Sequence, residues 1–176
     1  GLIYMEGYGL SETMAATHAN PFQACKAQCL GIPSIGVDSR VINVETLQQS
    51  GPHETGEIVM AGEQIFQGYW NNPAATADAF IEIDGKRFFR SGDLGYYDEQ
   101  GYFFLVDRVK RMINASGYKV WPAEVESLMY VRPAIREVCV ISMPHPRRGE
   151  SVKAVVVAAD GQQPSEEDII NWCHDN

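Results

Sequence analysis

The segment that divides this chain reads Val106-Asp107-Arg108-Val109-Lys110-Arg111-Met112-Ile113-Asn114-Ala115-Ser116-Gly117-Tyr118-Lys119-Val120-Trp121-Pro122-Ala123-Glu124-Val125-Glu126. An apolar strand, residues 102–106, leads into it, and Trp121-Pro122 begins a helix with glutamates in its first turn. Between the strand and the helix lie four basic residues, Arg108, Lys110, Arg111 and Lys119. Basic charge gathered in one loop of an acidic chain predicts a site for a small polyanion. For this segment alone, the alternative is a solvated loop.

Length and composition indicate a folded protein of one ordinary domain or two small ones. The chain has 176 residues, 45% of them apolar, which is enough to form a core. Its formal net charge of −9 argues against a nucleic-acid partner. No apolar run reaches about 18 residues, so we expect no transmembrane segment. Association with a membrane surface stays open, as does the oligomeric state.

The four cysteines, Cys25, Cys29, Cys139 and Cys173, fit neither a disulfide framework nor a paired zinc motif. A reduced, cytoplasmic protein is the expectation. The chain starts without an initiator methionine, and it ends inside a predicted helix. We therefore expect it to be a piece of a longer protein.

Residues 1–108 are predicted to be mostly β. We expect a short strand and tight turn over residues 1–13, a loop over 14–36, and strands over 37–45 and 56–61. Asn72-Pro73 predicts a helix over 73–80, and Asp84-Gly85 predicts a hairpin over 81–89. The Tyr69-Trp70 pair is interpreted as packing in the core or at an edge.

Residues 109–176 are predicted to form a smaller α+β part. It contains a helix over 122–131, Val-rich strands over 137–142 and 151–158 with a loop between them, and a last helix opened by a capping box at Ser165. The whole chain is thus predicted to have a mixed α+β fold, with a domain boundary after Arg108.

The turn Tyr8-Gly9-Leu10-Ser11-Glu12-Thr13 is the first candidate site. Gly7 and Gly9 would let the backbone approach a ligand closely. Tyr8 offers a flat ring, Ser11 a hydroxyl, and Glu12 a carboxylate of the kind that Mg²⁺ takes together with phosphates. The alternative is a simple β-turn before a capped helix. A serine-hydrolase elbow is rejected, because its Gly-x-Ser-x-Gly pattern lacks the second glycine here.

The tripeptide Ser91-Gly92-Asp93 is the second candidate. Asp93 follows a strand and a glycine, so its carboxylate is expected to be free to accept two hydroxyl hydrogen bonds. A vicinal diol such as ribose fits that geometry. The alternative is a turn cap.

Taken in order, these motifs resemble the acyl-adenylate-forming (AMP-binding) enzymes, which include acyl-CoA synthetases, luciferases and peptide-synthetase adenylation domains. The resemblance rests on Tyr8–Thr13, Gly56-Glu57 followed by Gly68-Tyr69, Ser91–Asp93 and Arg108–Glu126. The Pro-Ala-Glu-Val-Glu ending, Pro122–Glu126, looks most like the acyl-CoA and aryl-CoA synthetases.

The resemblance implies a role for individual residues. Tyr8, Gly9 and Ser11 would contact ATP or AMP, with the ring of Tyr8 on adenine and the hydroxyl of Ser11 at phosphate. Glu12 would hold Mg²⁺. Asp93 and Arg108 would hold the ribose.

The second part of the chain also receives implied roles. Lys110 would be the hinge about which a small lobe turns, and Gly117, Tyr118 and Lys119 would line the path of coenzyme A. Residues 1–108 would be the C-terminal part of the large AMP-binding domain, rich in β structure. Residues 109–176 would be the first part of a small, truncated C-terminal lobe.

The implied reaction activates a carboxylic acid, expected to be a fatty acid, with ATP and then transfers the acyl group to coenzyme A. The family's phosphate loop and catalytic lysine have no match in this sequence, and the lysine is expected beyond Asn176. No catalytic residue is therefore assigned, and the isolated chain is predicted to be inactive. There are two alternatives. One is a peptide-synthetase or luciferase-like relative, and the other is a non-catalytic module that binds a nucleotide or a partner.

Overall fold

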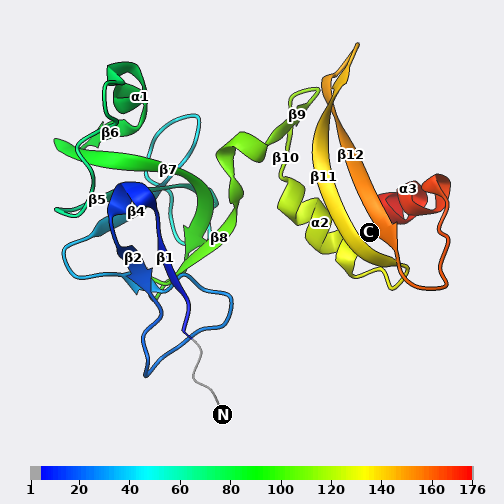
Figure 1. Cartoon of the computed structure of the whole chain (residues 1–176), viewed down its shortest axis with the longest axis horizontal. Coiled ribbons are helices and arrows are strands. Elements are labelled where there is room, and N and C mark those ends of the chain that lie inside the picture. The colour runs from blue at the N-terminus through cyan, green and yellow to red at the C-terminus, as the bar shows by residue number, and fades with distance from the viewer. Residues whose placement is uncertain (1–4, 176) are drawn as a thin grey trace. The chain divides into compact units, whose positions relative to one another are not determined.

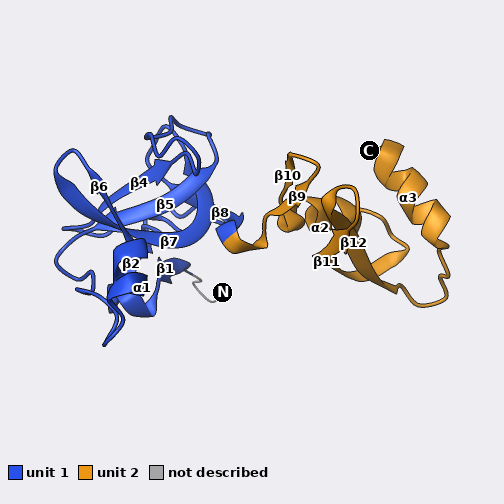
Figure 2. Ribbon diagram, turned by 90° about the horizontal axis from the view of Figure 1, so that it is seen from above, with its two compact units in different colours: residues 1–109 blue, residues 110–176 orange. Residues whose placement is uncertain are grey.

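The computed structural model describes residues 5–175 and has a mixed α+β fold, as the sequence predicts. The chain forms two compact units, Gly1–Val109 and Lys110–Asn176 (Figure 2). The division falls next to Arg108, after which the sequence places a boundary. The first four residues of the predicted N-terminal strand lie outside the described range. Within that range, no helix combines the length and the apolar character needed to cross a membrane.

The first unit contains two antiparallel sheets (Figure 1). The smaller sheet joins β1 (Gly7–Gly9), β2 (Ala16–Ala19) and β3 (Ile32–Pro33). The larger has the order β4-β5-β7-β6, and β8 also pairs with β7. Its strands are β4 (Asp38–Ile42), β5 (Gly56–Ala61), β6 (Phe80–Ile83), β7 (Lys86–Tyr97) and β8 (Phe103–Arg108).

Strand β5 is the centre of this unit, because all six of its residues are buried. Side chains alternate across a strand. Ile58 and Met60 accordingly join one apolar cluster, and Val59 and Ala61 join another. The strand therefore contributes to the apolar core on both faces of the sheet. Its first residues, Gly56 and Glu57, are buried with the rest.

Local sequence signals in this unit are confirmed where the chain turns. Asp84 and Gly85 have φ values of 52° and 72° and connect β6 to β7. The side chain of Asn72 accepts a hydrogen bond from the Ala75 amide and caps α1 (Pro73–Asp78). The prediction for residues 14–36 is wrong in part, because β2 and β3 lie there. Both strands are very short, and pairing with other strands defines them.

The second unit contains one antiparallel sheet of order β10-β9-β12-β11 and two helices. The strands are β9 (Ile113–Ala115), β10 (Tyr118–Val120), β11 (Ile135–His145) and β12 (Gly149–Ala158), and the helices are α2 (Pro122–Tyr130) and α3 (Glu166–Asp175). Met129 of α2 and Val140 of β11 share a buried cluster, against which Ile169 and Cys173 of α3 also pack. Ser165 exchanges hydrogen bonds with Asp168, so the predicted capping box is confirmed.

The loop predicted between the two Val-rich strands is wrong. Strand β11 continues to His145 and β12 begins at Gly149, which leaves only a short turn (Figure 1). The Nδ1 atom of His145 accepts hydrogen bonds from the amides of Arg147 and Arg148, each at 3.2 Å. His145 therefore closes this turn.

His18 makes the stability of the first unit depend on pH. Its ring is fully buried, with Nδ1 at 3.0 Å from the Thr17 hydroxyl and Nε2 at 3.0 Å from the Ser39 hydroxyl. Burial lowers the pKa of His18 from 6.5 to about 4. As pH falls below about 6.5, the unfolded state takes up the proton first, so stability is lost between pH 6.5 and 4.

We expect His18 to reduce the free energy of unfolding by about 3 kcal/mol between pH 7 and pH 4. The variant His18→Gln keeps a polar side chain that does not titrate there, so its unfolding should depend less on pH by that amount. Urea unfolding of the chain and of the variant at several pH values, followed by circular dichroism, measures the difference. Equal pH dependence of the two proteins would show that His18 is not the titrating group.

Candidate functional site

The tripeptide Ser91-Gly92-Asp93 forms a bulge in β7. Val59 of β5 pairs with Arg90, and Glu57 pairs with Leu94, so the tripeptide lies opposite Ile58 alone. The Ser91 hydroxyl donates to the Ile58 carbonyl at 2.6 Å and accepts from the Asp93 amide at 3.0 Å. Gly92 has a φ of +71°, which favours glycine. The bulge therefore takes Asp93 out of the regular ladder with β5, while Asp93 stays paired with Arg108 of β8.

Asp93 is the centre of a hydrogen-bonded cluster that also contains Tyr8 and Arg108. It is 3% exposed, the Tyr8 hydroxyl donates to its Oδ2 at 2.7 Å, and Arg108 Nε lies 3.0 Å from its Oδ1. The expectation of a free carboxylate is therefore wrong. Burial, and then the hydrogen bond to the carboxylate, raise the pKa of the Tyr8 phenol well above its usual value, so the phenol remains a donor.

The arrangement still leaves Asp93 able to meet a diol. Each carboxylate oxygen can accept more than one hydrogen bond. The Arg108 side chain is 67% exposed and ends β8, so it can move without disturbing the core. A ribose would share the carboxylate with Tyr8 and with Arg108, or replace the arginine there.

An open hollow of about 690 Å³ brings most of the remaining candidates of this unit together. Its lining includes Tyr8, Gly9, Ser11, Glu12 and Arg108. A Cβ atom on Gly9 would lie 2.6 Å from the Ala15 carbonyl oxygen. Glycine at position 9 is thus required by the close approach of the chain near β2, whatever binds in the hollow.

Glu12 is held by a residue that the sequence assigns to packing. The Tyr69 hydroxyl donates to Glu12 Oε1 at 2.9 Å, and the Phe66 amide donates to the Glu12 carbonyl at 2.8 Å. The Tyr69 ring packs edge-on against Phe66, with 4.9 Å between the ring centroids, so the packing interpretation is confirmed for Tyr69. It is wrong for Trp70, which is 91% exposed. The two aromatic residues therefore differ in their contacts. The Tyr69 hydroxyl binds Glu12, whereas the Trp70 side chain is exposed.

The oxygen atoms that Glu12 and Ser11 offer fit a magnesium ion that is bound together with the phosphates of a substrate. Mg²⁺ commonly takes one or two carboxylates together with phosphate oxygens and water. Glu12 supplies one carboxylate at the hollow, and Ser11 is exposed beside it. In the described part of the chain, no group of three or more His, Cys, Asp and Glu residues forms a metal site of its own.

The candidates of the second unit occupy one hairpin. Ser116 and Gly117 have φ values of 58° and 87° and connect β9 to β10. Tyr118 is 78% exposed, and Lys119 is exposed as well. The Ser116 amide donates to the Arg148 carbonyl at 3.2 Å, so the turn that carries two arginines adjoins this hairpin. Lys110 lies in the 3₁₀ turn Val109–Arg111, beside the division between the units.

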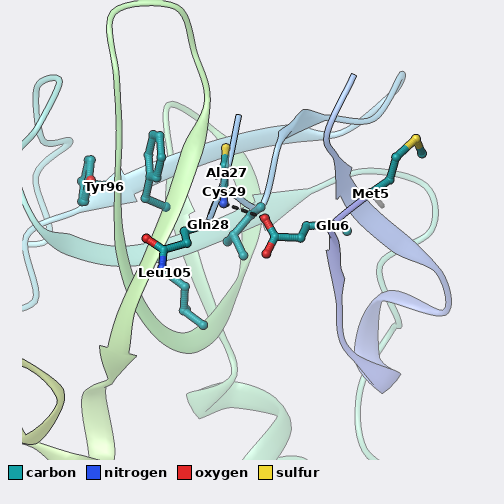
Figure 3. Close-up of a pocket in the computed structure, with 10 residues that line it drawn as sticks. Met5, Glu6, Ala27, Gln28, Cys29, Tyr96 and Leu105 are labelled. Atoms are coloured by element: carbon teal, nitrogen blue, oxygen red, sulfur yellow. Dashed lines mark hydrogen bonds between the residues drawn. The ribbon is translucent and has the colours of Figure 1, made fainter. Parts of the chain in front are cut away.

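A larger hollow, of about 860 Å³, lies elsewhere in the first unit (Figure 3). The Cys29 amide donates to Glu6 Oε2 in its wall at 2.9 Å. Of the candidate site residues that the sequence singles out, Gly7 lines it, and Gly7 also lines the smaller hollow. Its lining is Met5, Glu6, Gly7, Ala27, Gln28, Cys29, Leu30, Tyr96, Phe104 and Leu105. Size alone therefore does not select the site, and the cluster around Asp93 is the better candidate.

Sequence reasoning assigned no site role to Tyr69 or to Glu57. Glu57 Oε2 accepts from Arg90 Nε and Nη2 at 3.0 and 2.6 Å, and its Oε1 accepts from the Gly92 amide at 3.1 Å. One signal was available for Glu57, since it stands directly before the wholly apolar run Ile58–Ala61. A charge in a buried strand needs a partner.

Two family models match the chain. The model described as AMP-binding enzyme matches residues 3–70, and the model described as AMP-binding enzyme C-terminal domain matches residues 124–176. These two ranges contain the Tyr8–Glu12 turn and the helices α2 and α3, except for the start of α2.

Individual proteins resemble the chain over nearly its whole length. A long-chain-fatty-acid–CoA ligase of Bacillus subtilis (strain 168) is 42% identical over 94% of this chain and 29% of its own length. A luciferin 4-monooxygenase of Nipponoluciola cruciata is 37% identical over 95% of this chain and 30% of its own length. The crystal structure of ATP-bound MatB from Rhodopseudomonas palustris matches with a TM-score of 0.87 and 34% identity, covering 98% of this chain and 34% of that one. The chain thus spans about a third of the proteins it matches.

Proposed function

The chain belongs to the AMP-binding enzyme family, and from this premise we propose that it is part of an acid–thiol ligase. The longer protein would join a carboxylic acid to ATP, giving an acyl-adenylate and pyrophosphate. It would then transfer the acyl group to the thiol of coenzyme A and release AMP. A fatty acid is the favoured substrate, since a long-chain-fatty-acid–CoA ligase is 42% identical to the chain.

The observation that carries this proposal is the Tyr8–Asp93–Arg108 cluster beside the hollow. A buried carboxylate held by a phenol and a guanidinium is preorganised to accept hydroxyl hydrogen bonds from ribose. Tyr8 offers its ring to adenine, while Gly9 and Ser11 lie where the phosphates would pass. Arg108 adds positive charge beside a polyanion.

Magnesium bound at Glu12 would offset the charge of the phosphates during adenylation. The chain's own contribution there is to hold Glu12 in place, since Tyr69 binds its carboxylate and the Phe66 amide binds its backbone carbonyl. Residues 1–108 would belong to the large domain and 109–176 to the small lobe. Lys110 would be the hinge between the two half-reactions, and Gly117, Tyr118 and Lys119 would contact coenzyme A during the second.

A luciferase-like activity is the second candidate, since a luciferin 4-monooxygenase is 37% identical to the chain. Both activities begin with adenylation, so the difference lies in what happens to the adenylate. Thioester formation with coenzyme A supports the ligase, and light emission with luciferin and oxygen supports the alternative. A peptide-synthetase relative would instead load a carrier-protein thiol.

The test is ATP–pyrophosphate exchange that depends on an added carboxylic acid. We expect exchange by a longer protein that carries this sequence, strongest with one class among short, medium, long and aromatic acids. The chain alone is expected to show none, because the family's phosphate loop and catalytic lysine, which adenylation requires, have no match in its sequence. If the longer protein binds ATP and exchanges with no acid, the ligase proposal fails and a nucleotide-binding module replaces it.

A further inference from the structure

We propose that Glu57 is a positioning residue that aims Asp93 at the ribose hydroxyls by holding the amide of Gly92. This inference rests on the proposed function, because it assigns Asp93 to the ribose. It extends that function to a residue from a different strand, β5, which lies 36 positions away from Asp93 in the sequence. Glu57 itself would not touch the nucleotide.

The contacts of Glu57 are divided between its two oxygens. Oε2 takes both hydrogen bonds from Arg90, at 3.0 and 2.6 Å, and Oε1 takes the Gly92 amide at 3.1 Å. Glu57 is 2% exposed, so its charge depends on these donors in place of water. Arg90 thus holds Oε2 alone, and Oε1 remains for the Gly92 amide of the bulge.

The bulge has little else to hold its tip. A Cβ atom placed on Gly92 would meet nothing within 4 Å, so no neighbouring group packs against that side of Gly92. The backbone there has a φ of +71°, and its ladder hydrogen bonds are interrupted. The Gly92 amide is bound by Glu57, and the Asp93 amide is bound by Ser91. On the side of β5, the side chains of Glu57 and Ser91 thus hold the backbone that carries Asp93.

The contacts of Asp93 with β8 and β1 explain why the orientation of its carboxylate matters. Asp93 is paired in register with Arg108 of β8, and the Tyr8 hydroxyl reaches the same carboxylate from β1. The carboxylate must therefore keep its contact with Tyr8 and still have lone pairs available for the ribose hydroxyls. A small rotation of the Gly92–Asp93 peptide would move the carboxylate oxygens away from the position of a diol while leaving the rest of the sheet intact.

The test compares the affinities of ATP and 2′,3′-dideoxy-ATP in the longer protein, measured by titration calorimetry. The dideoxy nucleotide lacks both hydroxyls, so the ratio of its dissociation constant to that of ATP reports the ribose contacts alone. For the natural sequence we expect a ratio of about 100. The variant Glu57→Ala should reduce it to below about 5, while its affinity for the dideoxy nucleotide stays within about threefold. Glu57→Gln keeps an acceptor for the Gly92 amide and should restore most of the ratio.

The controls separate positioning from folding and from the proposed function. Glu82→Ala removes an exposed glutamate from β6 of the same sheet and should leave the ratio unchanged. If Glu57→Ala does not fold, Glu57→Leu fills the space without an acceptor, and Ser91→Ala weakens the same bulge from its other side. A folded Glu57 variant that loses affinity for both nucleotides equally, or keeps the full ratio, overturns the inference. A natural protein that does not distinguish the two nucleotides overturns the ribose assignment itself.

Discussion

Replacing Asp93 by alanine in the longer protein is expected to raise the KM for ATP at least about 100-fold in the exchange reaction, since hydrogen bonds to a charged group contribute about 1.5–3 kcal/mol each. The KM for the carboxylic acid should change by less than about threefold, because the acid does not contact ribose. The substitution also leaves the Tyr8 hydroxyl and the Arg108 guanidinium without their shared acceptor. Initial rates at varied ATP and varied acid measure the two constants separately.

The matched control is Asp78→Ala, which removes an exposed aspartate at the end of α1. It should leave both constants unchanged. An Asp93→Ala enzyme whose ATP dependence matches that of the natural protein would remove Asp93 from the nucleotide site. Equal increases in both constants would indicate a general loss of structure, which circular dichroism would show independently.

Replacing Lys110 by proline should spare exchange and abolish thioester formation, with a loss of about 100-fold or more expected when a required conformational step is blocked. Lys110 begins the second compact unit and lies within the 3₁₀ turn Val109–Arg111. Proline fixes φ near −65° and restricts Val109 before it. A segment that must take two backbone conformations would then be confined to one. Exchange and thioester formation are assayed on the same preparation.

The variant Lys110→Ala distinguishes backbone freedom from charge. It removes the ammonium group and keeps φ unrestricted, so we expect it to retain thioester formation within about tenfold of the natural protein, as for a residue that acts by geometry. Equal losses of both half-reactions in Lys110→Pro would contradict the hinge. Loss in the alanine variant as severe as in the proline variant would assign the role to the charge.

The parts of the fold that the sequence predicted correctly are those determined by neighbours in the chain. Asn72-Pro73, Asp84-Gly85 and the Ser165 capping box each bring together residues only a few positions apart. The strands β2 and β3 were missed, because four and two residues carry no periodicity and pairing with distant strands creates them. The long β11–β12 hairpin was shortened for a related reason. Its Pro and Gly residues indicate a loop, while cross-strand pairing extends the ladder past Pro144.

The candidate site shows the same division between local and distant information. Tyr8, Asp93 and Arg108 could be selected from their motifs, but their mutual contacts could not, since Tyr8 and Asp93 are 85 positions apart. The support of Glu12 by Tyr69 and of Gly92 by Glu57 joins residues 57 and 35 positions apart. Such pairs depend on how strands pack, which no local pattern records.

The pairing of Asp93 with Arg108 has a consequence for how this chain tolerates insertions and deletions. The two residues meet because β7 and β8 are adjacent strands, and residues 98–102 return the chain between them in a turn that Asp98 closes. Extra residues at that return would leave the pair intact. One residue added or removed inside β8, by contrast, would turn Arg108 to the opposite face of the sheet. It would also shift the backbone that leads to Lys110, two residues further on, where the second unit begins. Length variation is therefore expected to be harmless at the tip of this hairpin and damaging within its strands.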